Sequence, residues 1–215
     1  DKGILLYTDR GDKFLKKMKK DEAQVLFVAS AYEHIKSRGF TNISALCKTL
    51  EGKYYTKYDG NLYVLEDTTK GRHFSISSHE DGEKIGEVLA KYHLAADKVS
   101  PAPGSRAKVD WGRWMDKIKV QSARMKKFKE AVEEKKIKNK FDRLFISNVD
   151  IFEERAEEAY LLLKESRYME KVYKSMQTNQ LCHKTFKKHS LIQTDKDDIF
   201  VTSMEDCSYD IIETD

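Results

Sequence analysis

Short apolar runs separated by turn residues occupy the first 70 positions, a pattern that is typical of strands. Gly3–Tyr7 and Phe14–Met18 are divided by a turn-rich cluster at 9–12, which predicts two antiparallel strands. Three more strand-like runs follow, at 43–49, 53–58 and 62–66. The dipeptides Glu-Gly at 51–52 and Asp-Gly at 59–60 separate these runs, and Asp-Gly between strand patterns is a strong hairpin signal.

One helical pattern interrupts these strands, between residues 21 and 39. Asp21 is a candidate N-cap, and Gly39 provides a stop. The apolar positions repeat at helical spacing and form one broad face, made of Val25, Phe27, Val28, Ala31, Tyr32 and Ile35. Such a face predicts a helix that packs against a sheet. Residues 1–70 are therefore expected to form a small antiparallel sheet that carries one helix.

Helical spacing dominates after Gly71. The expected helices cover residues 81–96, 111–137, 141–165 and 168–176, and Pro101 and Pro103 mark a linker. Strand character returns only at 190–193 and 199–202, which are joined by a turn at 195–198. The predicted fold class is α+β, with a small β-rich N-terminal lobe at 1–70 and a helical C-terminal lobe at 71–215 that carries a β-hairpin.

Composition argues against several classes of protein, including membrane-spanning and disulfide-rich ones. The 215 residues suffice for one large domain or two small lobes. Lysine and arginine number 40 against 36 acidic residues, and the net charge of +4 is too mild to imply nucleic-acid binding by itself. No apolar run approaches the roughly 18 residues of a membrane span, and the N-terminus lacks a signal-peptide pattern. The three scattered cysteines argue against a disulfide framework and favour synthesis in a reducing compartment.

The stretch LCHKTFKKHSLI, at 181–192, has the form of an active-site loop, with a histidine, a gap and an apolar run that should begin a strand. A zinc site is disfavoured, because the spacing of its candidate ligands matches no common closed site. Those candidates are Cys182, His183, His189 and Cys207. A nucleophile pair of Cys182 with His183 is also disfavoured, because adjacent loop residues rarely face each other.

Six segments, taken in order, resemble the bacterial spore-coat kinase-like proteins (CotS type), within the fold family of aminoglycoside phosphotransferases and choline kinases. The segments are FLKKMK at 14–19, LYVLEDTTKGR at 62–72, LAKYHLAA at 89–96, WGRW at 111–114, and NQLCHKTFKKHSLI at 179–192 with IFVTSMEDCSYDII at 199–212. The resemblance implies a two-lobed, protein-kinase-like fold. It also implies that the family continues beyond both ends of this chain, so a fragment or a shortened member is expected.

The catalytic loop of this family reads His-x-Asp-x-x-x-x-Asn. Laid from His183, the aspartate position falls on Thr185 and the asparagine position on Ser190. A threonine hydroxyl is not a carboxylate base near neutral pH, and serine is a poorer magnesium ligand than an amide carbonyl. The resemblance therefore implies a remnant catalytic loop at 181–190, with His183 in a structural role.

The metal-binding strand of the family falls on the hairpin at 190–203. Aligned on Asp210, its two aspartate positions fall on Ser203 and Glu205. Magnesium needs hard, usually anionic oxygens, and a neutral serine supplies little of that charge. Glu205 or Asp206 could serve after a register slip, but a one-residue slip in a strand turns the side chain to the other face.

The resemblance places Lys16 and Glu66 at nucleotide-binding positions. Only one of Lys16 and Lys17 can face the cleft, because side chains alternate along a strand; two solvated lysines remain the alternative. The helix carboxylate that would pair with the lysine is left open between Glu22 and Glu33.

Three functions follow from these substitutions. The first is a catalytically impaired, pseudokinase-like protein that acts as a structural or interaction component of a spore coat, made in the cytoplasm, with other coat proteins as partners. The second is a residual ATP-dependent phosphotransferase on a small alcohol, an amine or a coat polysaccharide, with Mg²⁺ held by Glu205 or Asp206. The third is a nucleotide-binding module without chemistry. Neither a membrane nor a nucleic acid is an expected partner.

The helix expected at 111–137 and its extension to residue 140 are rich in lysine. Glu130, Glu133 and Glu134 are interleaved with these lysines at i,i+3 and i,i+4 spacing, which is typical of a solvated helix face. Binding of an anionic polymer is the alternative, and it depends on whether the lysines form one uninterrupted patch.

Overall fold

The structure, a computed structural model, describes residues 3–215. The chain divides into two compact units, one made of residues 3–110 together with 175–215, and one made of residues 111–174. The lobe boundary expected at residue 70 falls inside the first unit. The mixed fold itself, a small antiparallel sheet combined with five helices, confirms the predicted α+β class.

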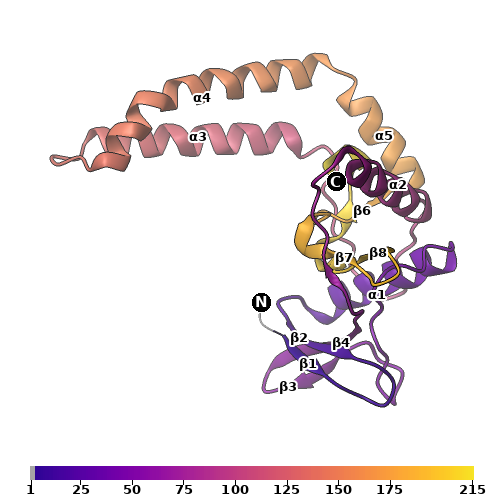
Figure 1. The fold of residues 1–215 in the computed structure, drawn as a ribbon. Coiled ribbons are helices and arrows are strands. Elements are labelled where there is room, and N and C mark those ends of the chain that lie inside the picture. The colour runs from indigo at the N-terminus through magenta and orange to yellow at the C-terminus, as the bar shows by residue number, and fades with distance from the viewer. Residues whose placement is uncertain (1–2) are drawn as a thin grey trace. The chain divides into compact units, whose positions relative to one another are not determined.

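The first unit contains a four-stranded antiparallel sheet in the order β1-β2-β4-β3 (Figure 1). Its strands are β1 (Ile4–Leu6), β2 (Lys13–Met18), β3 (Thr56–Tyr58) and β4 (Asn61–Asp67). In the register of β2 and β4, Lys16 lies opposite Val64. Because side chains two apart share a face of a strand, Lys16 and Glu66 project to the same side of the sheet.

The strand expected at 43–49 does not form, and the strand expected at 53–58 shortens to β3. Residues 43–49 make only isolated bridges, from Ile43 to Val201 and from Leu46 to Glu66. The reason lies in the backbone hydrogen bonds. The amide of Ser44 donates to Val201, which belongs to one sheet, whereas the amide of Cys47 donates to Leu65, which belongs to another. A segment whose donors serve two sheets cannot run as a ladder along either.

Helix α1 (Glu22–Ser37) begins and packs as its sequence predicts. The Asp21 side chain accepts a hydrogen bond from the amide of Gln24, and the Gln24 side chain accepts one from the amide of Asp21, which completes a capping box. All six residues of the expected apolar face are buried. Val25 on this helix packs with Met18 of β2 and Val64 of β4, so the helix covers the sheet.

The remaining elements of the first unit are short, apart from one helix. They are β5 (Arg72–His73), α2 (His79–Ala95), β6 (Leu181–Cys182), η1 (Lys188–Ser190), β7 (Leu191–Gln193), β8 (Ile199–Val201), η2 (Met204–Asp206), β9 (Ser208–Tyr209) and η3 (Ile212–Thr214). Strands β5, β7 and β8 form one small sheet, and β6 pairs with β9. The β7–β8 pair is the late hairpin that the sequence predicts.

The second unit is built from α3 (Trp114–Glu133) and α4 (Lys140–Glu165), which lie side by side and antiparallel (Figure 1). Helix α5 (Tyr168–Thr178) starts in this unit and ends in the first. Among residues 3–215, no helix combines the length and apolarity that crossing a bilayer requires.

The lysines of α3 do not form one uninterrupted basic patch, because two of them contact side chains on α4. Lys129 forms an ion pair with Asp150, and the Lys119 ammonium lies 4.9 Å from the ring centre of Tyr160. In the loop between the two helices, Lys135 pairs with Asp142 at 2.6 Å. These contacts favour the reading of α3 as an ordinary charged helix face.

Candidate functional site

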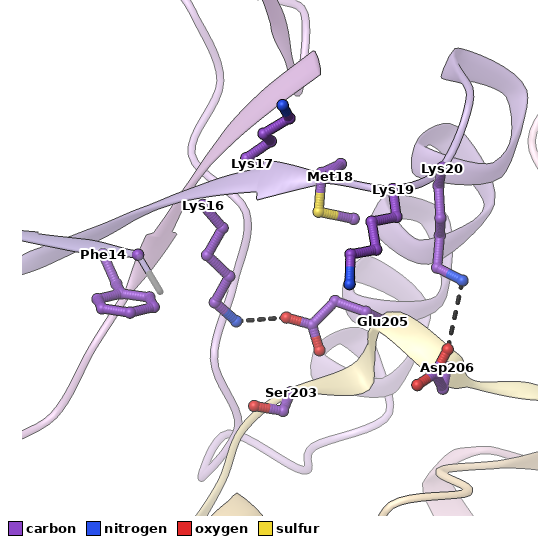
Figure 2. Close-up of a pocket in the computed structure, with 10 residues that line it drawn as sticks. Phe14, Lys16, Lys17, Met18, Lys19, Lys20, Ser203, Glu205 and Asp206 are labelled. Carbon is purple, nitrogen blue, oxygen red and sulfur yellow. Dashed lines mark hydrogen bonds and ion pairs between the residues drawn. The ribbon is translucent and has the colours of Figure 1, made fainter. Parts of the chain in front are cut away.

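Three segments that are far apart in the sequence bring charged side chains to one place. The ammonium group of Lys16 on β2 forms ion pairs with Glu66 on β4 and with Glu205 on η2. A cavity of about 460 Å³ opens beside these groups. Figure 2 shows Lys16 reaching from β2 toward Glu205, whereas Lys17 extends from the opposite face of the strand. Lys16 is thus the lysine that meets the acidic groups.

The Glu66 carboxylate is held from behind by α1. The Tyr32 hydroxyl donates a 2.9 Å hydrogen bond to Glu66 Oε1 and accepts a 3.2 Å hydrogen bond from the amide of Met204. Both side chains are buried. A single phenol therefore ties α1 to the strand that carries Glu66 and to the turn that carries Glu205.

Burial and charge act in opposite directions on this cluster. Burial disfavours the charged amine of Lys16, but the carboxylates of Glu66 and Glu205 outweigh it and raise the pKa of Lys16 above its ordinary value. Burial, and then the neighbouring Glu66 charge, raise the pKa of Tyr32 well above 10. At neutral pH the cluster therefore contains an ammonium and a neutral phenol.

The two acids considered on α1 lie elsewhere. Glu22 pairs with Lys57 and accepts a hydrogen bond from Tyr55, and Glu33 accepts one from Tyr54 and pairs with Lys48 at 3.2 Å. Neither forms an ion pair with Lys16. The carboxylate partner of the lysine comes from β4 instead, because the β2–β4 register places Glu66 on the face of Lys16.

Ser203 stands between β8 and η2, with φ at 65°. This is the left-handed region, in which residues other than glycine are uncommon. Its side chain lines the cavity together with Glu205 and Asp206. Of the two acids, Glu205 is paired with Lys16, and Asp206 lies 3.4 Å from the Lys20 ammonium.

These side chains do not fit a magnesium ion. Mg²⁺ requires hard, mostly anionic oxygens in near-octahedral geometry to offset the cost of its dehydration. Ser203 is neutral, and the Glu205 carboxylate is already engaged by a cation. Throughout the described part of the chain, no three His, Cys, Asp or Glu side chains cluster closely enough to hold a metal ion.

The loop at 181–190 is held by hydrogen bonds to the backbone of residues 202 and 203. The Thr185 hydroxyl donates to the carbonyl of Ser203 at 3.0 Å and lies 3.1 Å from His183 Nδ1. On its other side the His183 ring lies 2.9 Å from the carbonyl of Thr202. A carbonyl can only accept, so His183 Nε2 carries the proton and Nδ1 is the acceptor. The loop is thereby tied to the backbone that carries Ser203.

The Ser190 hydroxyl is also hydrogen-bonded within the loop. It is fully buried, donates within the loop to the carbonyl of Thr185, and accepts from the amide of Lys187 at 2.9 Å. These contacts make Ser190 a turn-stabilising residue whose hydroxyl is directed to backbone groups.

The sequence analysis missed Asp215. The Asp215 carboxylate accepts hydrogen bonds from the amides of His183 and Lys184 at 2.8 and 2.6 Å, and it lies 3.0 Å from His93 Nε2. Its side chain has no exposed surface. Nothing local in the sequence marks this residue, because its partners are about 30 and 120 positions away.

Lys184 was also missed. It has φ at 71°, and its ammonium lies 2.7 Å from the buried carboxylate of Asp210. Lys184 therefore connects the 181–190 loop to the segment that follows β9.

The zinc alternative has no support in the geometry. The Cys182 thiol donates to the carbonyls of Asp210 and Ile211, at 3.4 and 3.1 Å. Burial raises the pKa of the Cys207 thiol to about 12, whereas zinc binding requires a thiolate. His189 is exposed.

Comparison with solved structures shows the fold. An aminoglycoside phosphotransferase from Alicyclobacillus acidocaldarius matches with a TM-score of 0.77 at 15% identity, over 95% of this chain and 60% of that one. A spectinomycin phosphotransferase solved with ADP and spectinomycin matches with a TM-score of 0.68 at 14% identity, over 99% and 62%. An amicoumacin kinase solved with AMP-PNP and Ca²⁺ matches with a TM-score of 0.58 at 11% identity, over 97% and 57%. This chain thus spans about 60% of the length of these structures.

A family model described as "Spore coat putative kinase YutH" matches residues 8–212. This match covers nearly the whole chain, including β2, the remnant loop and the η2 turn. It confirms the resemblance to spore-coat kinase-like proteins that the sequence motifs carry. The chain belongs to this spore-coat kinase family.

Proposed function

We propose that this protein is a catalytically impaired member of its family that acts as a structural or interaction component of the spore coat. The observation that carries the proposal is the contact between Thr185 and Ser203. At the position where the family carries its catalytic aspartate, a threonine hydroxyl donates a 3.0 Å hydrogen bond to the backbone of Ser203. The hydroxyl of Thr185 is thus engaged by the backbone of Ser203.

Loss of the base has a chemical consequence. General-base catalysis contributes on the order of 10²–10⁴-fold to a rate. The neutral hydroxyl of Thr185 brings no negative charge to an incoming alcohol. His183 does not replace the base, because Nε2 is bonded to a carbonyl and Nδ1 faces the Thr185 hydroxyl. The impairment therefore extends to the immediate neighbours of the substituted position.

Loss of the metal site affects the positioning and charge neutralisation of the phosphate groups, rather than the removal of a proton from the acceptor. Positioning and neutralisation of the phosphate charge supply most of the rate enhancement in phosphoryl transfer. Ser203 and Ser190 supply no charge, and Glu205 is paired with Lys16. A protein with this site can keep a kinase-like shape for interaction with other coat proteins while transferring phosphate poorly or not at all.

The test is a pair of measurements on the parent and on the variant Thr185→Asp/Ser203→Asp. Release of labelled phosphate from ATP measures turnover, and a thermal-shift titration with ATP, with and without Mg²⁺, measures binding. We expect no magnesium-dependent turnover in the parent and a gain in the variant. A ligand at a hundredfold excess over its Kd stabilises the folded state by about 2.7 kcal/mol, so even modest binding is detectable.

A matched control is Thr41→Asp/Ser100→Asp, which adds the same two charges at exposed loop positions. Magnesium-dependent turnover in the parent that Glu205→Gln abolishes would contradict the proposal. That result would establish the second candidate, a residual phosphotransferase on a small alcohol, an amine or a coat polysaccharide. The observation favouring this candidate is that the Glu205 carboxylate lines the cavity beside Ser203.

A further inference from the structure

Two ion pairs cross the cavity from η2, one to β2 and one to the segment that follows β2. Glu205 pairs with Lys16, and Asp206 lies 3.4 Å from Lys20. Figure 2 shows both contacts, with Lys16 reaching from β2, Lys20 reaching from the segment that follows β2, and the two acids presented by the turn. Both partners of the first contact are partly buried, with 17% of the Lys16 side chain and 28% of the Glu205 side chain exposed.

The two carboxylates on Lys16 differ in accessibility. Glu66 is only 4% exposed and is fixed by the Tyr32 hydroxyl, whereas Glu205 is more exposed and lines the cavity. An ammonium group has three N–H donors and no acceptor. Because Glu205 lines the cavity and Glu66 does not, an anion that enters the cavity approaches Lys16 beside Glu205 and is repelled by that carboxylate. The anion therefore competes with Glu205 for Lys16, while Glu66 stays in place.

We propose that Glu205 is an internal competitor that closes this site, because its carboxylate takes the contact with Lys16 that the phosphate groups of a ligand would otherwise make. The ligand class is a triphosphate, either inorganic or carried by a nucleoside. The inference rests on the proposed function, since it describes a site that binds phosphate groups without a divalent cation and without turnover.

The charges around the cavity support this assignment. Its lining includes the side chains of Lys16, Lys19 and Lys20 against two acids, Glu205 and Asp206, whereas Lys17 borders the cavity but extends its side chain from the opposite face of β2. Figure 2 shows Lys16, Lys19 and Lys20 extending to the same side, toward the two acids. Loss of the Glu205 charge leaves a lysine-lined cavity with one acid, and such a concentration of ammonium groups attracts polyanions without help from a metal.

The experiment is calorimetric titration of sodium tripolyphosphate into the parent and into Glu205→Gln, in buffer containing EDTA. Glutamine keeps the size of the side chain and removes its charge. We expect Glu205→Gln to bind about tenfold more tightly or better, on the scale of close charge pairs in partly buried sites. Glu205→Asp keeps the charge and is expected to bind within about threefold of the parent.

Two further arms complete the test. ATP should show the same gain as tripolyphosphate, and adenosine should show none; a gain reproduced by adenosine would overturn the proposal, since the base or ribose would then be the group recognised. Glu51→Gln is the matched control, because Glu51 is 77% exposed and pairs only with the surface residue Lys53 among the contacts described. It should bind as the parent does.

Equal affinities of the parent and Glu205→Gln would overturn the inference, as would an equal gain in Glu205→Asp. Neither result bears on turnover, which these titrations do not measure. Failure of this inference is therefore distinguishable from failure of the proposed function, which depends on magnesium-dependent phosphate release.

Discussion

The hydroxyl of Tyr32 lies between Glu66 and the amide of Met204, donating to the first at 2.9 Å and accepting from the second at 3.2 Å. A residue of α1 thereby supports Glu66, the partner of Lys16, and at the same time the turn that follows β8. In the protein-kinase fold a carboxylate on the helix usually pairs with the lysine directly. Here a phenol on the helix holds a carboxylate on a strand, and that carboxylate pairs with the lysine.

Tyr32→Phe should destabilise the protein by about 1–3 kcal/mol, because it leaves a buried carboxylate and a buried amide each short of one hydrogen bond. Chemical denaturation measures the change in the free energy of unfolding. Tyr58→Phe is the control, since Tyr58 is 74% exposed. A Tyr32→Phe protein as stable as this control would show that the hydroxyl contributes nothing.

Lys16→Met should cost about 3–5 kcal/mol, the range for removing one partner of a buried ion pair. The remaining Glu66 carboxylate would be buried with only Tyr32 as a donor. Because the cost comes from the uncompensated charge, the double variant Lys16→Met/Glu66→Gln should recover part of the lost stability. Urea unfolding of the parent, the single variant and the double variant checks this. A double variant less stable than Lys16→Met would point to lost packing of the lysine stem instead.

His183 predicts a pH dependence. Burial lowers the pKa of His183 below its ordinary value of 6.5. As the pH falls, His183 therefore takes up a proton in the unfolded chain before it does so in the folded protein. The contribution of neutral, buried His183 to folding stability is complete above pH 6.5 and is lost as the pH falls below that value. His183→Gln should therefore show a flatter loss of stability between pH 7.5 and pH 5 than the parent.

Urea unfolding at both pH values measures this difference. His79→Gln is the control for a solvated histidine, because the His79 side chain is 95% exposed. If the parent and His183→Gln lose stability in parallel, then His183 titrates normally in the folded protein.

Asp215→Asn should destabilise the protein at pH 7 by about 1.5–3 kcal/mol, the range for hydrogen bonds to a charged group. Burial alone would raise the pKa of Asp215, but hydrogen bonds from His93 and from the amides of Lys184 and His183 outweigh it and lower the pKa below 3.8. The stabilisation is therefore present above pH 3.8 and is lost as the pH falls further.

The difference between Asp215→Asn and the parent should accordingly shrink below pH 3.8. Guanidinium unfolding at pH 7 and in acid checks this prediction, with Asp195→Asn at an exposed turn as the control. A constant difference down to pH 2 would mean that the carboxylate has no special stability in its charged form.

Most of the regular structure was accessible from local patterns. The apolar face and capping box of α1, the β7–β8 hairpin and the helices of residues 114–165 are encoded by periodicities and turn residues that act over a few positions. The exception, residues 43–49, has strand composition, but its amides bond to two different sheets. Local composition carries no information about which distant carbonyl an amide will meet.

The assignment of Thr185, Ser190 and Ser203 to the family's catalytic-loop and metal positions is a prediction from the spacing of the surrounding motifs. The contacts of these residues could not be predicted in that way. Only the tertiary structure shows that Thr185 bonds to the backbone of Ser203 and that Ser190 turns its hydroxyl inward. Hydrogen-bond partners depend on distances of a few tenths of an ångström, which spacing along the chain does not specify.

The sequence by itself determined the fold class and the family. The tertiary structure alone decided the partners of Lys16. The sequence left its carboxylate partner open between Glu22 and Glu33, but the β2–β4 register and the left-handed turn at Ser203 bring Glu66 and Glu205 to it instead. Charge interactions fall off within several ångströms in a screened medium, so only the folded backbone determines which charges come close enough to interact.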